Sequence, residues 1–161
     1  VEWASTEMSP FLGGKTMGKK KKEVDDRFRR FGTVSFTSIT KVNDFIDYLD
    51  QGKVMGTRCK DCGLAFFPPR ADCHQCLKSH VEWFQVSGTG KLVSYSKLEY
   101  APVGFGEDLP YCIAVLDYGD YKVFGRIADD VPEEEIRVGM EMKTMVNELP
   151  NRQMNYVFKK A

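Results

Sequence analysis

The stretch from Cys59 to Cys76 reads CKDCGLAFFPPRADCHQC and contains two Cys-x-x-Cys pairs, Cys59 with Cys62 and Cys73 with Cys76. Each pair forms a turn that can direct two sulfur atoms toward one point, and ten residues separate the pairs. Four thiolates complete the tetrahedron that zinc prefers, and Gly63 relieves the backbone strain of the first turn. The stretch therefore predicts a rubredoxin-like zinc ribbon that holds one structural zinc ion.

The same four cysteines permit two other interpretations. A redox dithiol rarely needs two pairs, and a rubredoxin-like iron site, which this ligand set allows, would require an electron-transfer role. A shell of four sulfurs leaves no open position for water or substrate, so the metal is expected to stabilise the fold and not to catalyse. His74 and His80 could each replace a cysteine as a ligand, but solvated surface positions suit both better.

Length and composition are typical of a small globular chain. The 161 residues are 42% apolar and 12% aromatic. No apolar run approaches the roughly 20 residues that a membrane helix needs. Charged residues, proline and glycine interrupt residues 1–17, so no export signal is predicted. We therefore expect a cytoplasmic protein with no membrane partner, whose reduced cysteines bind metal in preference to forming disulfides.

Residues 1–37 are polar and contain the run Lys19–Lys22, followed by three arginines. Such a segment has too little apolar content to order itself. We predict a flexible or partner-ordered basic arm that contributes docking surface. A solvated tail without a partner is the alternative.

Residues 38–54 are predicted to contain an amphipathic helix. Ser38 or Thr40 can supply the N-cap oxygen, and Gly52 can take the left-handed conformation that ends a helix. The apolar positions follow the helical spacing i, i+3, i+4 and i+7, namely Val42, Phe45, Ile46 and Leu49. This stripe must be buried, either on the chain's own barrel or as a docking surface on a partner protein.

Short alternating segments after Gly88 and Gly90 predict a small antiparallel sheet. Five strands are expected, at residues 91–100, 111–118, 121–127, 140–147 and 153–159. Gly119-Asp120 fits a tight hairpin turn, and five short strands with one longer connection suit an OB-type barrel. The fold class expected is therefore mainly β, with the zinc ribbon at residues 55–86 and a five-stranded OB-type barrel at residues 87–161.

Residues with catalytic chemistry are few. Cys112 stands alone in an apolar strand, where a buried, inert thiol is the usual outcome. A nucleophile needs a nearby base, and both histidines of the chain lie in or next to the ribbon. The sequence also contains no Gly-rich phosphate-binding loop. We therefore expect an accessory module with no catalytic residues of its own.

The order of these features resembles one known family. A helix, Cys-x-x-Cys-Gly, the FPPR of residues 67–70, a second Cys-x-x-Cys and a barrel opened by Gly-Thr-Gly resemble the DUF35 family of zinc-ribbon plus OB-fold, acyl-CoA-associated proteins. The RVGM of residues 137–140 is a further landmark, and the resemblance covers about residues 39–150. His74 stands where the family commonly has a proline, a departure that leaves the metal ligands intact.

The resemblance implies a non-catalytic subunit that docks on a thiolase-like or other acyl-CoA enzyme in a hetero-oligomer and helps form or shield its coenzyme A site. The basic arm and the overall size are similar to those of small thiolase subunits within the family. On this interpretation the ribbon hairpin presents Phe66, Phe67 and Arg70 at an exposed tip. Arg70 would contact a coenzyme A phosphate, and Phe66 or Phe67 would cover the adenine or pantetheine arm. The alternative is that the phenylalanines belong to the ribbon core and Arg70 is solvated.

Two other function classes compete with the accessory subunit. Zinc ribbons and OB barrels also bind nucleic acid, and an independent enzyme is a third possibility. Nucleic-acid binding needs aromatic side chains beside basic ones. Up to His80 the chain has 14 basic and 10 acidic residues, and after it 9 basic and 13 acidic residues. The barrel region is therefore acidic, which makes nucleic acid an unlikely partner despite its tyrosines.

Overall fold

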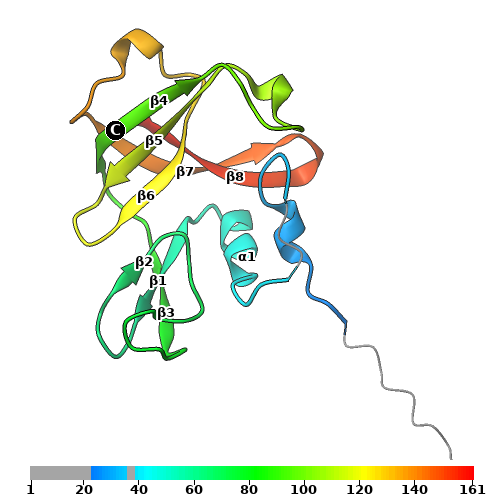
Figure 1. Cartoon of the computed structure of the whole chain (residues 1–161), viewed down its shortest axis with the longest axis vertical. Helices are drawn as coiled ribbons and strands as arrows, with labels where there is room; N and C mark the ends of the chain where they lie inside the picture. Colours follow the sequence, from blue (N-terminus) through cyan, green and yellow to red (C-terminus); the bar gives the residue numbers. More distant parts are fainter. Residues whose placement is uncertain (1–22, 36–38) are drawn as a thin grey trace, which may run out of the picture.

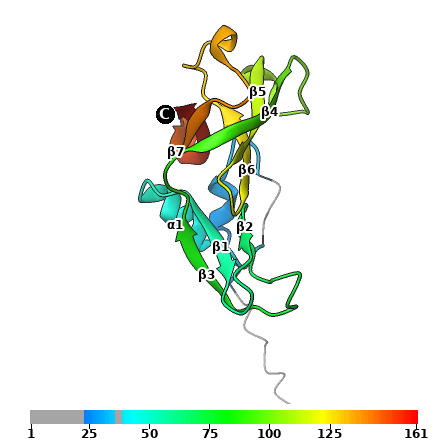
Figure 2. The same ribbon diagram turned by 90° about the vertical axis from the view of Figure 1, so that its left-hand side faces the viewer.

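The computed structural model describes residues 23–35 and 39–161. Figures 1 and 2 show a three-stranded ribbon below a β-barrel, with the helix α1 (Asp44–Asp50) at their junction. The fold is thus mainly β, a zinc ribbon followed by a closed five-stranded barrel, as the sequence predicts. Among the described residues, no helix is long and apolar enough to cross a membrane.

The helix α1 is shorter than predicted. Asn43 occupies the N-cap position without a side-chain capping bond, so the predicted cap Thr40 is wrong, and the other candidate, Ser38, lies outside the described residues. The Thr40 hydroxyl instead accepts a hydrogen bond from the Val42 N–H at 3.3 Å, in the turn before the helix. At the other end Gly52 has φ +76° and donates its N–H to the Leu49 carbonyl at 2.8 Å, which confirms the predicted stop.

The ribbon is an antiparallel sheet with the strand order β2-β1-β3. Its strands are β1 (Met55–Cys59), β2 (Ala65–Phe66) and β3 (Val81–Gln85). Gly56 lies at the centre, where an added Cβ would come within 2.6 Å of the Phe84 ring and 2.7 Å of the Phe66 carbonyl oxygen. Only glycine fits this close approach, which lets the three strands pack flat behind the metal-binding turns.

The barrel closes in the order β4-β5-β6-β8-β7, with β6 and β8 parallel and the other pairs antiparallel. Its strands are β4 (Gly90–Leu98), β5 (Tyr111–Asp117), β6 (Lys122–Ile127), β7 (Glu141–Leu149) and β8 (Gln153–Lys160). All five lie within two residues of the predicted strands. The expected hairpin is confirmed: Tyr118 N–H donates to the Tyr121 carbonyl at 3.0 Å across Gly119, whose φ is +92°.

Short 3₁₀ turns lie in the connections. They are η1 (Arg27–Arg30) before α1, η2 (Gly106–Asp108) between β4 and β5, η3 (Glu133–Glu135) between β6 and β7, and η4 (Pro150–Arg152) between β7 and β8.

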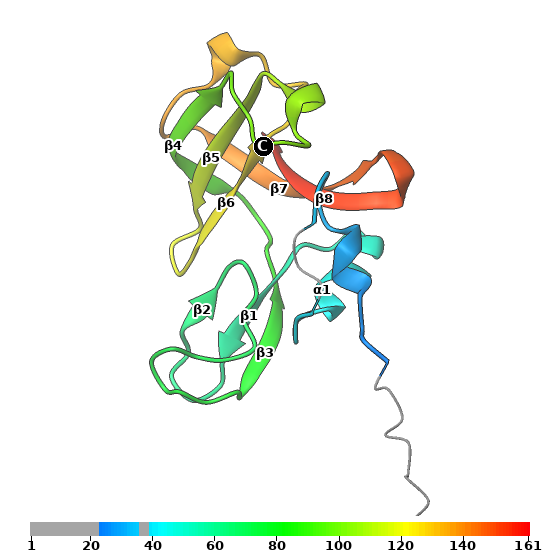
Figure 3. The same cartoon turned by 45° about the vertical axis from the view of Figure 1, so that its right-hand side comes forward.

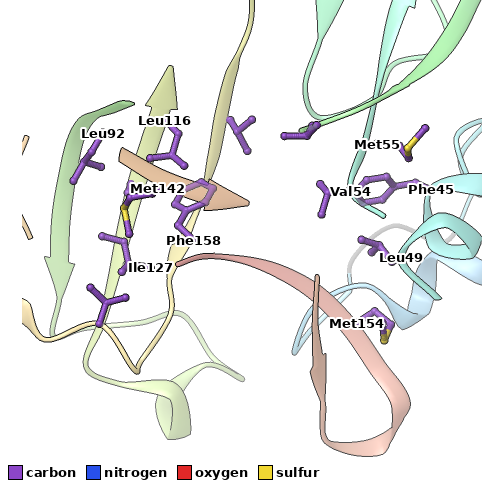
Figure 4. Close-up of a cluster of buried hydrophobic side chains, with 14 of the residues drawn as sticks. Phe45, Leu49, Val54, Met55, Leu92, Leu116, Ile127, Met142, Met154 and Phe158 are labelled. Atoms are coloured by element: carbon purple, nitrogen blue, oxygen red, sulfur yellow. The ribbon is translucent and has the colours of Figure 1, made fainter. Parts of the chain in front are cut away.

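The core extends from the barrel to the helix and the ribbon (Figure 4). Within the barrel the buried side chains include Leu92, Leu116, Ile127, Met142 and Phe158. At the junction the same core continues through Phe45, Leu49, Val54, Met55 and Met154. The helix and the inner edge of the ribbon are therefore packed on the barrel and do not form separate units.

The apolar stripe of α1 is part of this core. Phe45, Ile46 and Leu49 are at most 1% exposed, and Val42 is half-buried. Of the two alternatives drawn from the sequence, burial within the chain is correct. The docking role predicted for the stripe is therefore corrected for Phe45, Ile46 and Leu49, because these three side chains have no surface to offer a partner.

Part of the basic arm is folded onto α1, contrary to the prediction. Phe28 and Phe31 lie 6.3 Å and 5.8 Å from Phe45 between ring centroids. Arg27 pairs with Asp44 at 3.0 Å and also with Asp47, and Arg30 binds Asp50 through two 2.8 Å hydrogen bonds. Phe28 and Phe31 supply the apolar contact, although the segment that contains them is mostly polar and charged. The run Lys19–Lys22 lies outside the described residues.

Candidate metal centre

The four predicted ligands meet at one point. The sulfur atoms of Cys59, Cys62, Cys73 and Cys76 all lie within 4.8 Å of one another. The Sγ atoms of Cys62 and Cys73 are 3.7 Å apart. A tetrahedral zinc with Zn–S bonds of about 2.3 Å requires sulfur pairs about 3.8 Å apart. The cluster therefore fits one four-coordinate zinc ion with no position left open.

Two similar backbone turns aim the sulfurs. In the first, at the end of β1, Gly63 has φ +76° and donates its N–H to the Cys59 carbonyl at 2.9 Å. In the second, Leu77 has φ +54° and donates to the Cys73 carbonyl at 2.9 Å. The Cys76 N–H points at the Cys73 sulfur at 3.4 Å. Such N–H donors stabilise thiolate charge, as in other cysteine metal sites.

Burial and charge explain why this cluster needs a cation. Cys59 and Cys73 are 1% exposed, whereas Cys62 is open to solvent. The backbone N–H of Cys76 lowers the pKa of the Cys73 thiol to about 7. The side chain of Cys62 raises the pKa of Cys76 in turn. Four adjacent thiolates repel one another, so a divalent metal is required to hold all of them deprotonated.

The two histidines lie beside the cluster and outside its ligand set. His74 is exposed, with its ring 5.6 Å from the Phe66 ring. His80 is also exposed, and its Nδ1 lies 3.3 Å from the Asp61 carboxylate, which Lys78 also contacts at 3.2 Å. The four cysteines are the group of potential metal ligands found among the described residues.

The predicted aromatic tip is not exposed. Phe66 is 6% exposed and packs with Cys59 and Cys73 inside the ribbon. The Phe67 ring lies 5.2 Å from the Tyr156 ring. The expectation that these phenylalanines cover coenzyme A is therefore corrected, because both are committed to the chain's own packing.

Arg70 is exposed, and its backbone is held rigidly. The Thr57 side chain, which is fully buried, accepts the Arg70 N–H at 2.8 Å and donates to the Arg70 carbonyl at 2.9 Å. The Arg70 guanidinium lies 5.6 Å from the Phe66 ring. No carboxylate lies within ion-pair distance of it among residues 23–35 and 39–161. This guanidinium is therefore available to an anion.

A shallow pocket of about 260 Å³ surrounds Arg70 between α1 and the ribbon. Its other lining residues include Lys41, Thr57, Ser79 and Trp83, together with Asp44, which pairs with Arg27. The sequence analysis did not identify these neighbours. They come from three separate segments, and no local pattern indicates that they meet.

The barrel thiol Cys112 has no histidine beside it. Cys112 is half-buried in β5, and burial raises the pKa of its thiol. Both histidines of the chain belong to the ribbon, at the other end of the molecule from the β4–β5 sheet that carries Cys112 (Figure 3). The thiol shares a pocket with Lys97 and Glu133, which pair with each other at 2.7 Å, and its raised pKa makes it a poor nucleophile at neutral pH.

Two of the barrel tyrosines, Tyr118 and Tyr121, are packed at the junction with the ribbon and not on an open face. Tyr118 and Tyr121 stack on each other at 5.3 Å, and Tyr121 lies 4.8 Å from Phe84 of the ribbon. Arg58 covers the other part of this junction, 5.4 Å from the Phe84 ring. These aromatic side chains fix the barrel to the ribbon, so this arrangement gives no support to nucleic-acid binding.

Family models match the two folded parts of the chain in tandem. Residues 47–82 match "ChsH2, rubredoxin-like zinc ribbon domain", and residues 83–148 match "ChsH2, C-terminal OB-fold domain".

Two related proteins are described as members of the DUF35 family. A "DUF35 domain-containing scaffold protein" of Methanocaldococcus jannaschii is 35% identical over 94 residues, which are 57% of this chain and 66% of the relative. The protein of the same description from Methanothermobacter thermautotrophicus is 32% identical over 55% of this chain and 67% of its own length. The chain thus spans about two thirds of these relatives. A solved chain described as "Ltp2-ChsH2(DUF35) aldolase" has the same fold, with a TM-score of 0.64 and 21% identity over 77% of this chain and 98% of that one.

Proposed function

Because this chain belongs to the DUF35 family of zinc-ribbon and OB-fold proteins, we propose that it is a non-catalytic accessory subunit of a thiolase-type acyl-CoA enzyme complex. The observation that carries this proposal is the combination of a closed metal shell with an unpaired, rigidly mounted arginine. A closed shell cannot activate water or substrate. The ribbon would then serve an accessory role on a partner enzyme, with Arg70 as the group that binds an anion.

The family descriptions support a partner enzyme. The relatives are described as scaffold proteins, and the solved chain of the same fold is described by two names joined, Ltp2 and ChsH2, as an aldolase. A scaffold acts by holding other proteins, and this description supports an accessory role. Within the family, the basic arm and the overall size resemble those of the small subunit of a thiolase that acts on 2-benzoylsuccinyl-CoA, and that subunit is our narrower proposal.

Arg70 is the residue through which the chain would contact coenzyme A. A guanidinium binds phosphate with two parallel hydrogen bonds, and its planar fork is suited to this geometry. Lys41 borders the same pocket and adds a second positive charge, while Trp83 adds an aromatic face. Since Thr57 fixes the Arg70 backbone, the point from which this exposed side chain extends is held in place beside the pocket.

The test uses the reconstituted complex of the chain with its thiolase-type partner. Arg70→Ala is expected to raise the KM for coenzyme A about tenfold, the effect of losing one charge-assisted hydrogen bond. Zinc content and kcat should not change. Arg152→Ala, which removes an exposed arginine at the β7–β8 turn, is the matched control and should leave the KM as it is. Unchanged coenzyme A binding by Arg70→Ala would refute the residue assignment, and full activity of the partner alone would refute the accessory role.

A further inference from the structure

An apolar groove lies on the barrel face formed by β5 and β6. It has a volume of about 500 Å³, and its lining residues include Leu98, Phe105, Tyr111, Ile113, Phe124 and Tyr156. Residues of the connection between β4 and β5 border it, and so does Phe31 of the arm. Figure 3 shows this connection and the arm on the same side of the barrel. The second and third strands of an OB barrel, with the connection before them, are the surface on which such barrels bind ligands, and the groove lies there.

A polar pocket of about 530 Å³ adjoins the groove and shares Arg126 and Asn155 with it. Arg126 separates the two spaces. Its guanidinium pairs with Asp108 at 2.8 Å and lies 3.8 Å from the centroid of the Tyr111 ring. Because this charge is already neutralised, the groove itself offers aromatic and aliphatic surface to an apolar side chain.

The polar pocket is acidic. Four carboxylates line it, namely Glu107, Asp108, Asp129 and Asp130, against the two basic side chains Arg126 and Lys159. Lys159 pairs with Asp130 at 2.8 Å, as Arg126 does with Asp108. Glu107 and Asp129 have no basic partner within ion-pair distance in residues 23–35 and 39–161. Two free negative charges therefore lie directly beside the apolar groove.

The apolar surface continues beyond the groove. Phe124, in β6, is 56% exposed. Tyr100 and Val103 belong to the same β4–β5 connection as the groove residue Phe105, and they are 90% and 97% exposed. A small molecule held in the groove would leave Tyr100 and Val103 in water. Exposed apolar surface of this extent is typical of a site for another protein.

We propose that this face binds a segment of the partner enzyme in which an apolar side chain, for the groove, lies next to lysine or arginine, for the acidic pocket. The inference rests on the proposed accessory role and names the surface through which that role is exerted. Charge complementarity selects the occupant. Nucleic acid would bring phosphates against Glu107 and Asp129, whereas a basic segment neutralises both carboxylates.

A second copy of this chain does not complement the face. Its exposed apolar residues beside the groove, Tyr100 and Val103, are accompanied by acidic neighbours: Glu99 precedes Tyr100, and Glu107 follows Val103 by four residues. A two-fold contact that placed them in the groove of another copy would bring these carboxylates toward its acidic pocket. Like charges across an interface disfavour the wrong partner, so an enzyme surface of opposite charge fits better.

The test measures the Kd of the full-length chain for its thiolase-type partner enzyme. Phe124→Asp is expected to raise the Kd at least about 30-fold, the loss typical of a central interface side chain. Val103→Asp should raise it about tenfold. Because Val103 is almost fully exposed, its replacement leaves the core unchanged. Melting temperature and zinc content show that both variants are folded.

A second pair of substitutions tests the charge of the bound segment. Glu107→Gln combined with Asp129→Asn should raise the Kd about tenfold at low ionic strength. The same variant should also show a smaller loss of affinity with rising salt than the wild type, because salt screens the attraction that the two carboxylates provide. An unchanged Kd and salt dependence would overturn the assignment of a basic segment.

The matched control is Val138→Asp. Val138 is 65% exposed between β6 and β7 and lines neither the groove nor the acidic pocket, so this variant should bind like the wild type. Wild-type affinity in both Phe124→Asp and Val103→Asp would overturn the docking face and leave the accessory role standing. A wild-type chain that forms no complex with the enzyme would overturn the accessory role, and this inference with it. Self-association of the chain that Phe124→Asp abolishes would assign the face to a second copy and would overturn the proposal.

Discussion

Replacement of Phe45 by alanine tests whether α1 belongs to the core of this chain. Its ring is 1% exposed and lies 5.8 to 6.5 Å from the rings of Phe31, Phe28, Phe67 and Tyr156, counted between centroids. Phe→Ala at a buried site costs about 3–5 kcal/mol, because the transfer free energy is lost and a cavity remains. At about 2–4 °C per kcal/mol for a chain of this size, we expect the melting temperature to fall by about 6–20 °C.

The assay is thermal unfolding followed by circular dichroism on the metal-loaded protein. Val138→Ala, at an exposed position, is the control and should shift the midpoint by no more than the effect of about 0.5 kcal/mol. A stripe that served a partner would behave differently, because Phe45→Ala, and even Phe45→Asp, would then melt like the wild type. That result would refute the assignment of α1 to the core.

Two further predictions concern the metal and the arm. Cys59→Ser should lose most of the zinc, measured by metal analysis, because three thiolates no longer close the shell; retention of a full equivalent would contradict the four-sulfur site. The bond from Arg30 lowers the pKa of Asp50, so this contact stabilises arm docking above the ordinary carboxyl pKa of 3.8 and is lost as the pH falls below it. The protection factors of residues 27–31, taken relative to the intrinsic exchange rate at each pH, should fall in that acidic range, and Asp50→Asn should show the lower protection at neutral pH already. Exchange that is the same in both proteins at every pH would exclude a role for this pair.

The strands and the metal ligands were predictable because their signals are local. Alternation of apolar residues and glycine turns set the five barrel strands, and the spacing of four cysteines set the site. The predicted start of the helix was wrong because the Thr40 hydroxyl bonds a backbone N–H in the turn before the helix. The sequence pattern of such a turn is the same as that of a true N-cap. The prediction of a flexible or partner-ordered arm was wrong for its folded part, because Arg27 and Arg30 pair with aspartates of α1. This pairing depends on tertiary contacts that the sequence does not show.

Whether the side chains of Phe66 and Phe67 face solvent or core could not be predicted from the sequence for a similar reason. Each follows a metal-binding turn in a hairpin, a position that can face solvent or core equally well. The outcome depends on Tyr156, in the last strand of the barrel, which contacts Phe67 at 5.2 Å. Arg70 is exposed although its neighbour Pro69 is buried.

The metal site has little apolar core of its own, and this determines what the metal stabilises. Its cluster consists of Cys59, Phe66 and Cys73 with two half-buried neighbours, separate from the main core that joins α1 to the barrel. The free energy of metal binding is therefore needed mainly by the outer ribbon, whereas the barrel has its own packing. Arg70 lies next to the outer ribbon: Thr57 of β1 bonds its backbone, and its guanidinium lies 5.6 Å from the Phe66 ring. A metal that never touches substrate would thus still control the anion-binding arginine, by keeping its supporting hairpin folded.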